Sequence, residues 1–369
     1  MGLCAESRSS QTSNSSMRGA PASQWEGRNM VVALLKRTST YLMVLLGLSV
    51  LIFVISRVAP GDPARIALGP RAPESTVQAL REKMNLDKPY AVQYLLWLRD
   101  ALRLDFGESL QTRRPVVQDI KEHLPATLEV VFIAAAWMIC CGLLLGILAA
   151  KFNGTWLDGI IRVFSYLGVV APAFVWAVIL MLVFAYKVPI FPSMGRIGLS
   201  MTSPTRVTGM YTIDYLLAGN FAGFKDALRH LVLPAISLTF GGIAQSARIT
   251  RGTMVENSLK DYILAQRAYG IPERKMLFKY WLKPSLIPTI SVTSLDIASM
   301  FGGAYLVEQI FNYPGLARYG MQAVLNKDLN AIAGVAMVLG CVFIIVNIII
   351  DFIIARLDPR VRAWGGDAS

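Results

Sequence analysis

The sequence predicts an all-α integral membrane protein with about six transmembrane helices, and three observations support this fold class. The 369 residues have a mean hydropathy of +0.49, and 54% of them are hydrophobic, a bias typical of membrane proteins. The apolar residues gather in runs of roughly the 20 residues that one helix needs to cross a bilayer. These runs do not alternate polar and apolar residues as the strands of a membrane barrel do, so the spans are expected to be helices.

The apolar runs give the expected positions of the spans. A first helix is expected at 30–57, where the uncharged stretch TSTYLMVLLGLSVLIFVIS lies. The later spans are expected at about 126–150, 163–186, 231–247, 284–307 and 331–354. The length and number of these runs argue against the alternative that they are core helices of a large soluble protein.

Segments of other composition flank the spans. Residues 1–29 are rich in Ser, Gly, Arg and Asn, so they are expected to form a flexible cytoplasmic tail. An outer loop is expected at 58–125, then the core of further spans at 126–355 and a second cytoplasmic tail at 356–369. Within the outer loop, apolar residues at helical spacing over 89–104 predict an amphipathic helix. It is expected either to lie along the membrane or to pack as an ordinary loop helix.

Basic residues in the short connecting segments predict the orientation of the chain. Lys36 and Arg37 precede the first span, Lys151 and Arg162 flank the turn after the second, and Arg356 follows the last. Because cytoplasmic loops are enriched in Lys and Arg, both chain termini are expected in the cytoplasm. The net charge of +12 is spread over such connections instead of forming one basic domain, which argues against a nucleic-acid partner.

The inner loop expected at 248–283 has the pattern of structured protein. It contains the stretch DYILAQRAYGIPERKMLFKYWLKP. The pattern predicts a short helix that begins near Asp261 and ends at a left-handed Gly270, with Pro272 in the first turn of a second helix. A solvated basic loop is the alternative, and it explains the positive charge of this segment but not Gly270 and Pro272.

The same stretch resembles the cytoplasmic signature of the permease subunits of ABC importers, in particular the dipeptide and oligopeptide class. That signature is a short Ala-rich helix followed by Gly, and here Ala265 and Ala268 give the helix small residues that another protein can approach closely. The resemblance extends from about residue 30 to residue 362. It is carried by the motifs RVAPGDP, LDKPYAVQYLLWL, LDFGESL, LPATLE, VEQIFNYPGLARYG and LDPRVR.

The resemblance implies a type I ABC importer transmembrane domain that forms half of a translocation pathway for di- or oligopeptides. It implies that the short inner helix is the coupling helix, which rests in a groove of the ATPase. The residues implied at this contact are Asp261, Ala265, Gln266, Arg267, Ala268, Gly270 and Pro272. The implied partners are a second homologous permease subunit, two ATP-binding cassette subunits and an extracytoplasmic solute-binding protein. The implied location is the inner membrane of a bacterium, where the chain is multi-pass and contacts lipids.

No catalytic or cofactor motif is present in the sequence. A G-x-x-x-x-G-K-[ST] phosphate-binding loop is absent, so no cofactor is expected on this chain, and ATP and Mg are expected on the partner subunits. The motifs HExxH and GxSxG are also absent, and His123 and His230 are far apart. The cysteines show no metal-binding spacing. The chain is therefore predicted to be neither an enzyme nor a metal-binding protein.

Ionisable residues inside a span are costly, so they mark candidate positions on the translocation path. Glu129 lies one turn into the second span, and Asp296 lies midway along the fifth. Asp296 is expected either to line the path and favour cationic or amine groups, or to bond with neighbouring serines or a partner subunit. Gly302 and Gly303 are further candidates because glycine permits close packing in a moving bundle.

Other solutes and other classes of protein remain as alternatives. Importers with the same pattern move nickel, glutathione, oligosaccharides or opine-like compounds. A secondary carrier that works without ATP would have inverted repeats, and the sequence shows no such duplication. An intramembrane enzyme or a scaffold would need paired Asp residues or a Ser/His pair at membrane depth, and Asp296 has no obvious mate.

Overall fold

The computed structural model describes residues 39–55, 63–69, 71–83 and 85–357. The tail predicted at 1–29, and most of the one predicted at 356–369, lie outside these residues. Within the described ranges the regular structure is helical, apart from one isolated bridge between Glu108 and Pro115. The prediction of an all-α protein is therefore confirmed.

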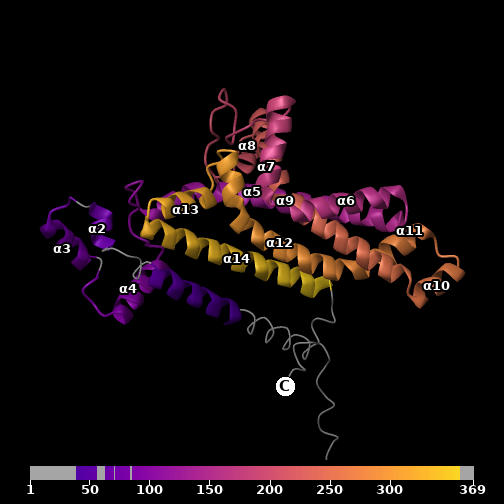
Figure 1. Ribbon diagram of the computed structural model, residues 1–369, viewed down its shortest axis with the longest axis horizontal. Coiled ribbons are helices and arrows are strands. Elements are labelled where there is room, and N and C mark those ends of the chain that lie inside the picture. The colour runs from indigo at the N-terminus through magenta and orange to yellow at the C-terminus, as the bar shows by residue number, and fades with distance from the viewer. Residues whose placement is uncertain (1–38, 56–62, 70, 84, 358–369) are drawn as a thin grey trace, which may run out of the picture.

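Long helices lie lengthwise beside one another and form the bundle (Figure 1). They are α5 (Val116–Lys151), α6 (Trp156–Val170), α9 (Phe221–Ser258), α12 (Lys283–Ile310) and α14 (Leu329–Leu357). The shorter helices are α2 (Pro63–Leu68), α3 (Glu74–Lys83), α4 (Tyr90–Leu102), α7 (Ala173–Met181), α8 (Tyr211–Leu217), α10 (Asp261–Ala268), α11 (Glu273–Lys275) and α13 (Leu316–Leu325). Two π-helical turns follow α7 and α11, namely η1 (Leu182–Lys187) and η2 (Met276–Leu282).

In the described part of the chain, 4 helices are long and apolar enough to cross a membrane, or 5 if one bent pair counts as a span. The 4 long ones are Val116–Lys151, Phe221–Ser258, Glu273–Ile310 and Leu329–Ile354. They contain the spans expected at 126–150, 231–247, 284–307 and 331–354. Each helix is longer than its apolar run because polar and amphipathic turns continue it at one or both ends. Helix α5, for example, begins at Val116, inside the loop expected at 58–125.

The described part of the first expected span is the shorter apolar helix Ser39–Ile55. Near its start the Tyr41 hydroxyl donates a hydrogen bond to Asp351 of α14, at 2.8 Å. Near its end Phe53 contacts Tyr94 of α4, with 5.4 Å between the ring centroids. The helix predicted at 89–104 is thus α4, and it packs on the first span.

The third expected span, 163–186, is bent. It falls on α6 and on α7 with η1, and the direction of the helix bends by 109° between these two segments. The break lies at Ala171 and Pro172. Pro172 has no N–H group to continue the hydrogen bonds of α6, and it holds Ala171 in an extended conformation with φ −87° and ψ 127°. As a result, α7 stands across the bundle while α6 lies along it (Figure 1).

Helices α5 and α9 pack closely because small residues face each other. A Cβ atom added to Gly142 would lie 2.6 Å from Cβ of Ser246, and one added to Gly146 would lie 2.5 Å from Cβ of Thr250. The two pairs are one helical turn apart on both helices. This pattern of small residues lets membrane helices approach each other without a large apolar side chain between them.

Helices α10 and α13 lie near opposite ends of the bundle, and α8 stands next to α7 above the long helices (Figure 1). At the α10 end, Arg251 of α9 donates a hydrogen bond to Asp158 of α6 at 2.8 Å. At the α13 end, the N–H group of Gly195 donates to the carbonyl of Phe311 at 3.0 Å. The order of inner and outer segments along the chain stays a prediction.

Candidate functional site

The predicted inner helix and its corner are present in the structure. The helix is α10, with Asp261 in its first turn and Arg267 in its last, which places each charge where the helix dipole favours it. Gly270 follows with φ +73°, the left-handed conformation that was predicted for it. The N–H group of Ile271 donates to the carbonyl of Gln266 at 3.2 Å, which closes the helix end. The chain then turns sharply into α11.

Helix α10 is anchored on one side and open on the other. Ile263 is fully buried, whereas Ala265 and Ala268 are exposed. Leu264 and Tyr269 are large side chains that are also exposed at this end of the bundle. Exposed apolar residues gathered on one short helix are typical of a surface that binds another protein.

Both ends of α10 lead into long helices of the bundle. Its N-terminus follows α9, and its C-terminus leads through Pro272, α11 and η2 into α12. Pro272 precedes α11 with φ −59°, consistent with its predicted place at the start of the second helix. A force on α10 therefore acts on two spanning helices at once.

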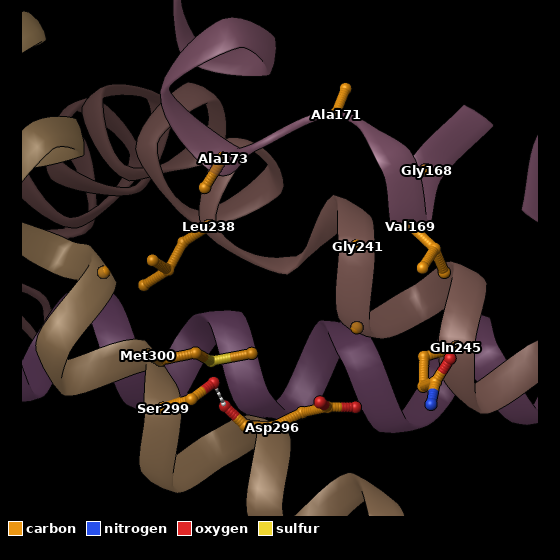
Figure 2. Close-up of a pocket in the computed structure, with 12 residues that line it drawn as sticks. Gly168, Val169, Ala171, Ala173, Leu238, Gly241, Gln245, Asp296, Ser299 and Met300 are labelled. Carbon is orange, nitrogen blue, oxygen red and sulfur yellow. Dashed lines mark hydrogen bonds between the residues drawn. The ribbon is translucent and has the colours of Figure 1, made fainter. Parts of the chain in front are cut away.

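The described residues also form a cavity of about 380 Å³ between the bend of α6 and α7, helix α9 and helix α12. Figure 2 shows its walls. Glycine and alanine make up half of the lining, namely Gly168, Ala171, Ala173, Gly241, Gly242 and Gly303. The remaining lining residues are Val169, Leu238, Gln245, Asp296, Ser299 and Met300. The cavity exists because so many lining positions have little or no side chain.

Asp296 lies midway along α12 and is the charged side chain among these lining residues. Its Oδ2 atom is inaccessible to solvent and accepts no hydrogen bond from the described residues. The Ser299 hydroxyl donates to the backbone carbonyl of Asp296 at 2.8 Å, and so does not satisfy the carboxylate. Gly303 lines the same cavity, whereas Gly302 does not. The role of these residues in translocation stays a prediction.

Glu129 lies elsewhere, in a buried cluster near the α13 end. Arg196 donates to its carboxylate at 2.6 Å, and the backbone N–H of Thr212 donates at 2.6 Å. The Tyr313 hydroxyl donates to it at 3.0 Å. Burial raises the pKa of the Tyr313 phenol well above its ordinary value, so this group stays a proton donor. The Arg196 guanidinium also lies 3.6 Å from the ring centroid of Tyr211.

Several residues of these sites were not singled out from the sequence. Arg196 is 67 positions from Glu129, and no local pattern connects the two. The pair Gly241 and Gly242, together with the polar Gln245, did give a signal, because all three lie inside or next to an apolar run. Among the described residues no group of three or more His, Cys, Asp and Glu side chains is arranged to hold a metal ion.

Two protein-family models match most of the chain. Residues 142–363 match the family model described as binding-protein-dependent transport system inner membrane component, and residues 30–131 match the N-terminal model of the same membrane component.

Similar proteins come from several bacteria. The chain is 36% identical to the probable D,D-dipeptide transport system permease protein DdpB of Escherichia coli, over 88% of this chain and 96% of the relative. It is 32% identical to the dipeptide transport system permease protein DppB of Alkalihalophilus pseudofirmus, over 90% of this chain and 100% of the relative. It is also 32% identical to the di/tripeptide transport system permease protein DppB of Pseudomonas aeruginosa, over 90% and 99%. With its helical bundle and this coverage, the chain belongs to the family of binding-protein-dependent transport system inner membrane components, the membrane permeases of ABC importers.

Proposed function

We propose that this chain is one of two permease subunits of a bacterial inner-membrane importer that moves dipeptides and oligopeptides at the expense of ATP. The names of the relatives from three bacteria, which refer to D,D-dipeptide, dipeptide and di/tripeptide transport, support the choice of peptides as solute. The observation that carries the proposal is α10, an exposed short helix at one end of the bundle whose flanks lead into two spanning helices.

The energy comes from partner subunits. The chain has no phosphate-binding loop, so ATP and Mg bind to two ABC subunits at the cytoplasmic face. The contact surface on this chain is α10 with its corner, formed by Asp261, Ala265, Gln266, Arg267, Ala268, Gly270 and Pro272. When the ATPase subunits close, they shift α10, and the shift acts on α9 and α12. These two helices line the cavity that contains Asp296, so the movement changes its access.

The second permease completes the path on the open side of the bundle. In the apolar window of α14 only 6% of the residues are fully buried, so parts of this helix remain accessible to lipid or another subunit. The external binding protein delivers solute to the α13 end, where the outer connections lie. Solute then passes between the two permeases toward the α10 end.

Copurification after mild detergent extraction tests this proposal. The wild-type chain should retain a second permease and two ATPase subunits in stoichiometric amounts. The variant Ala265→Trp should lose the ATPase subunits and keep the second permease, because a bulky side chain blocks close approach to α10. The matched control is Ala222→Trp, which changes an exposed alanine on α9 at the opposite end and should lose neither.

Two results would contradict the proposal. One is solute transport by the purified chain alone in liposomes, without ATPase subunits. The other is equal retention of the ATPase subunits by the wild-type chain and by Ala265→Trp, which would place the contact elsewhere.

A further inference from the structure

Among the described carboxylates, Asp296 is the one with a buried oxygen that accepts no hydrogen bond. The carboxylate of Glu129 is bound by Arg196 at 2.6 Å, and Asp351 accepts a hydrogen bond from Tyr41 at 2.8 Å. Glu308 accepts hydrogen bonds from the hydroxyl of Thr127 at 2.5 Å and from a backbone N–H group. The fold therefore satisfies these carboxylates within the chain, and it leaves Oδ2 of Asp296 without a donor among the described residues.

An unpaired carboxylate at membrane depth is costly unless something supplies a positive charge or a proton. Among the described residues that line the cavity, no side chain is basic. Gly242 lets α9 pack closely on Met138 of α5, since an added Cβ atom would lie 2.2 Å from its Sδ, and the same position lies beside Asp296, with 3.7 Å to its Cβ atom. Half of the residues that line the cavity of Asp296 are glycine or alanine, and this leaves room for a transient ligand.

Gln245 of α9 supplies a hydrogen-bond donor to the cavity, whereas the Asp296 carboxylate only accepts. Its Oε1 atom accepts a hydrogen bond from Arg248 at 2.6 Å, and because arginine only donates, this contact orients the amide. The nitrogen of the amide is therefore the group that remains to donate. Figure 2 shows Gln245 and the Asp296 carboxylate on the same side of the cavity, with Ser299 on the other side of Asp296. The cavity therefore offers a negative acceptor and a neutral donor on the same side.

We propose that this cavity is a transit subsite for the main chain of a short peptide. The Asp296 carboxylate pairs with the terminal ammonium group, and the Gln245 amide donates to a carbonyl or carboxylate oxygen. The terminal amine of a peptide has a pKa of about 7.7–8.0, so it is charged at neutral pH. A cavity of about 380 Å³ lies in the range of sites that hold small molecules. The inference rests on the proposed function, because it assumes that peptides cross here.

The subsite lowers the barrier to transit. A peptide ammonium group that leaves water for the bundle loses its hydration, and Asp296 replaces part of that hydration with a charge-assisted hydrogen bond. The bend at Pro172 forms one wall and α12 the other, so a shift of either helix opens or closes the subsite. Binding here is brief because the contacts are few.

The test uses the complete importer, reconstituted in liposomes with its ATPase subunits, second permease and binding protein. The probe is dialanine at saturating binding protein, and uptake is measured per ATP hydrolysed. Asp296→Asn should lower this ratio about tenfold, the value of one charge-assisted hydrogen bond, and Asp296→Glu should restore part of it. Gln245→Leu should lower it by a smaller factor. Asp351→Asn is the matched control, since it removes a carboxylate of α14 outside the cavity and should leave the ratio unchanged.

Three results would contradict the inference or the proposed function. Normal uptake per ATP in Asp296→Asn overturns the inference. Loss of the second permease on purification of Asp296→Asn also overturns it, because the partner of Asp296 would then be a side chain of that subunit. A wild-type complex that hydrolyses ATP but imports no dipeptide defeats the proposed peptide function itself, and the subsite falls with it.

Discussion

Two carboxylates on spanning helices show how the same chemical group takes different roles at different positions. Glu129 is buried and accepts hydrogen bonds from Arg196, Thr212 and Tyr313, so it joins α5, α8 and the outer connections into one unit. Asp296 lies against a cavity with an oxygen that accepts no hydrogen bond from the described residues. The first arrangement stabilises the fold, and the second is the one on which the proposed subsite rests.

The Glu129–Arg196 pair leads to a prediction about stability. Replacing Arg196 by Met leaves the Glu129 carboxylate buried without its positive partner, which costs about 3–5 kcal/mol of folding free energy. The measurement is the thermal unfolding midpoint of the purified protein in detergent. The control is Arg99→Met, which breaks an exposed pair with Asp100 and should cost about 0–1 kcal/mol.

A double variant checks the cause of this loss. Adding Glu129→Gln to Arg196→Met removes the uncompensated charge and should recover part of the stability. If Arg196→Met were as stable as Arg99→Met, the pair would not hold the outer connections in place.

At the scale of elements, α10 and the bend of α6 and α7 are both shaped by single residues. Gly270 ends α10 because it adopts φ +73° without strain, and Pro172 breaks α6 because it has no N–H group. Such local causes are visible in the sequence. The extent of α9 is less visible, because its polar ends continue the helix well beyond the apolar run at 231–247.

The corner after α10 leads to a prediction about coupling. No atom lies within 4 Å of a Cβ added to Gly270, so a substitution acts through backbone strain and not through a clash. Gly270→Val strains the left-handed conformation by about 1–2 kcal/mol and should displace the contact with the ATPase. The complex should then hydrolyse ATP with less transport for each ATP, as measured in liposomes. Gly270→Asn is the control, since Asn tolerates this conformation and should keep coupling near normal. Equal coupling in both variants would count against a role for the corner.

At the scale of the whole molecule, the bundle has two distinct ends. The α10 end carries the turn between α5 and α6 and the C-terminal end of α9, and α8 and the connection that contains Arg196 lie on the α13 side. The excess of Lys and Arg around α10 predicts that this end faces the cytoplasm.

Thiol labelling in right-side-out vesicles tests this orientation. In a chain without its native cysteines, a membrane-impermeant maleimide should label Leu199→Cys from outside. It should label Tyr269→Cys only after the vesicles are opened. Both native side chains are exposed, so accessibility to the reagent does not differ for reasons of packing. Labelling of Tyr269→Cys in sealed vesicles would reverse the assigned orientation.

The sequence by itself determined the helical class, the positions of the apolar runs and the helix and corner at Asp261–Ala268 and Gly270, because each follows from residues close together in the chain. It also indicated Asp296 as a costly residue at membrane depth. Only the tertiary structure decided which carboxylate is paired and which has a buried oxygen without a donor among the described residues. Arg196 meets Glu129, and Gln245 faces the cavity of Asp296, through packing of helices distant in the sequence. Two charged or polar groups interact strongly only when a few ångströms separate them in space. The number of residues between them along the chain does not specify this distance.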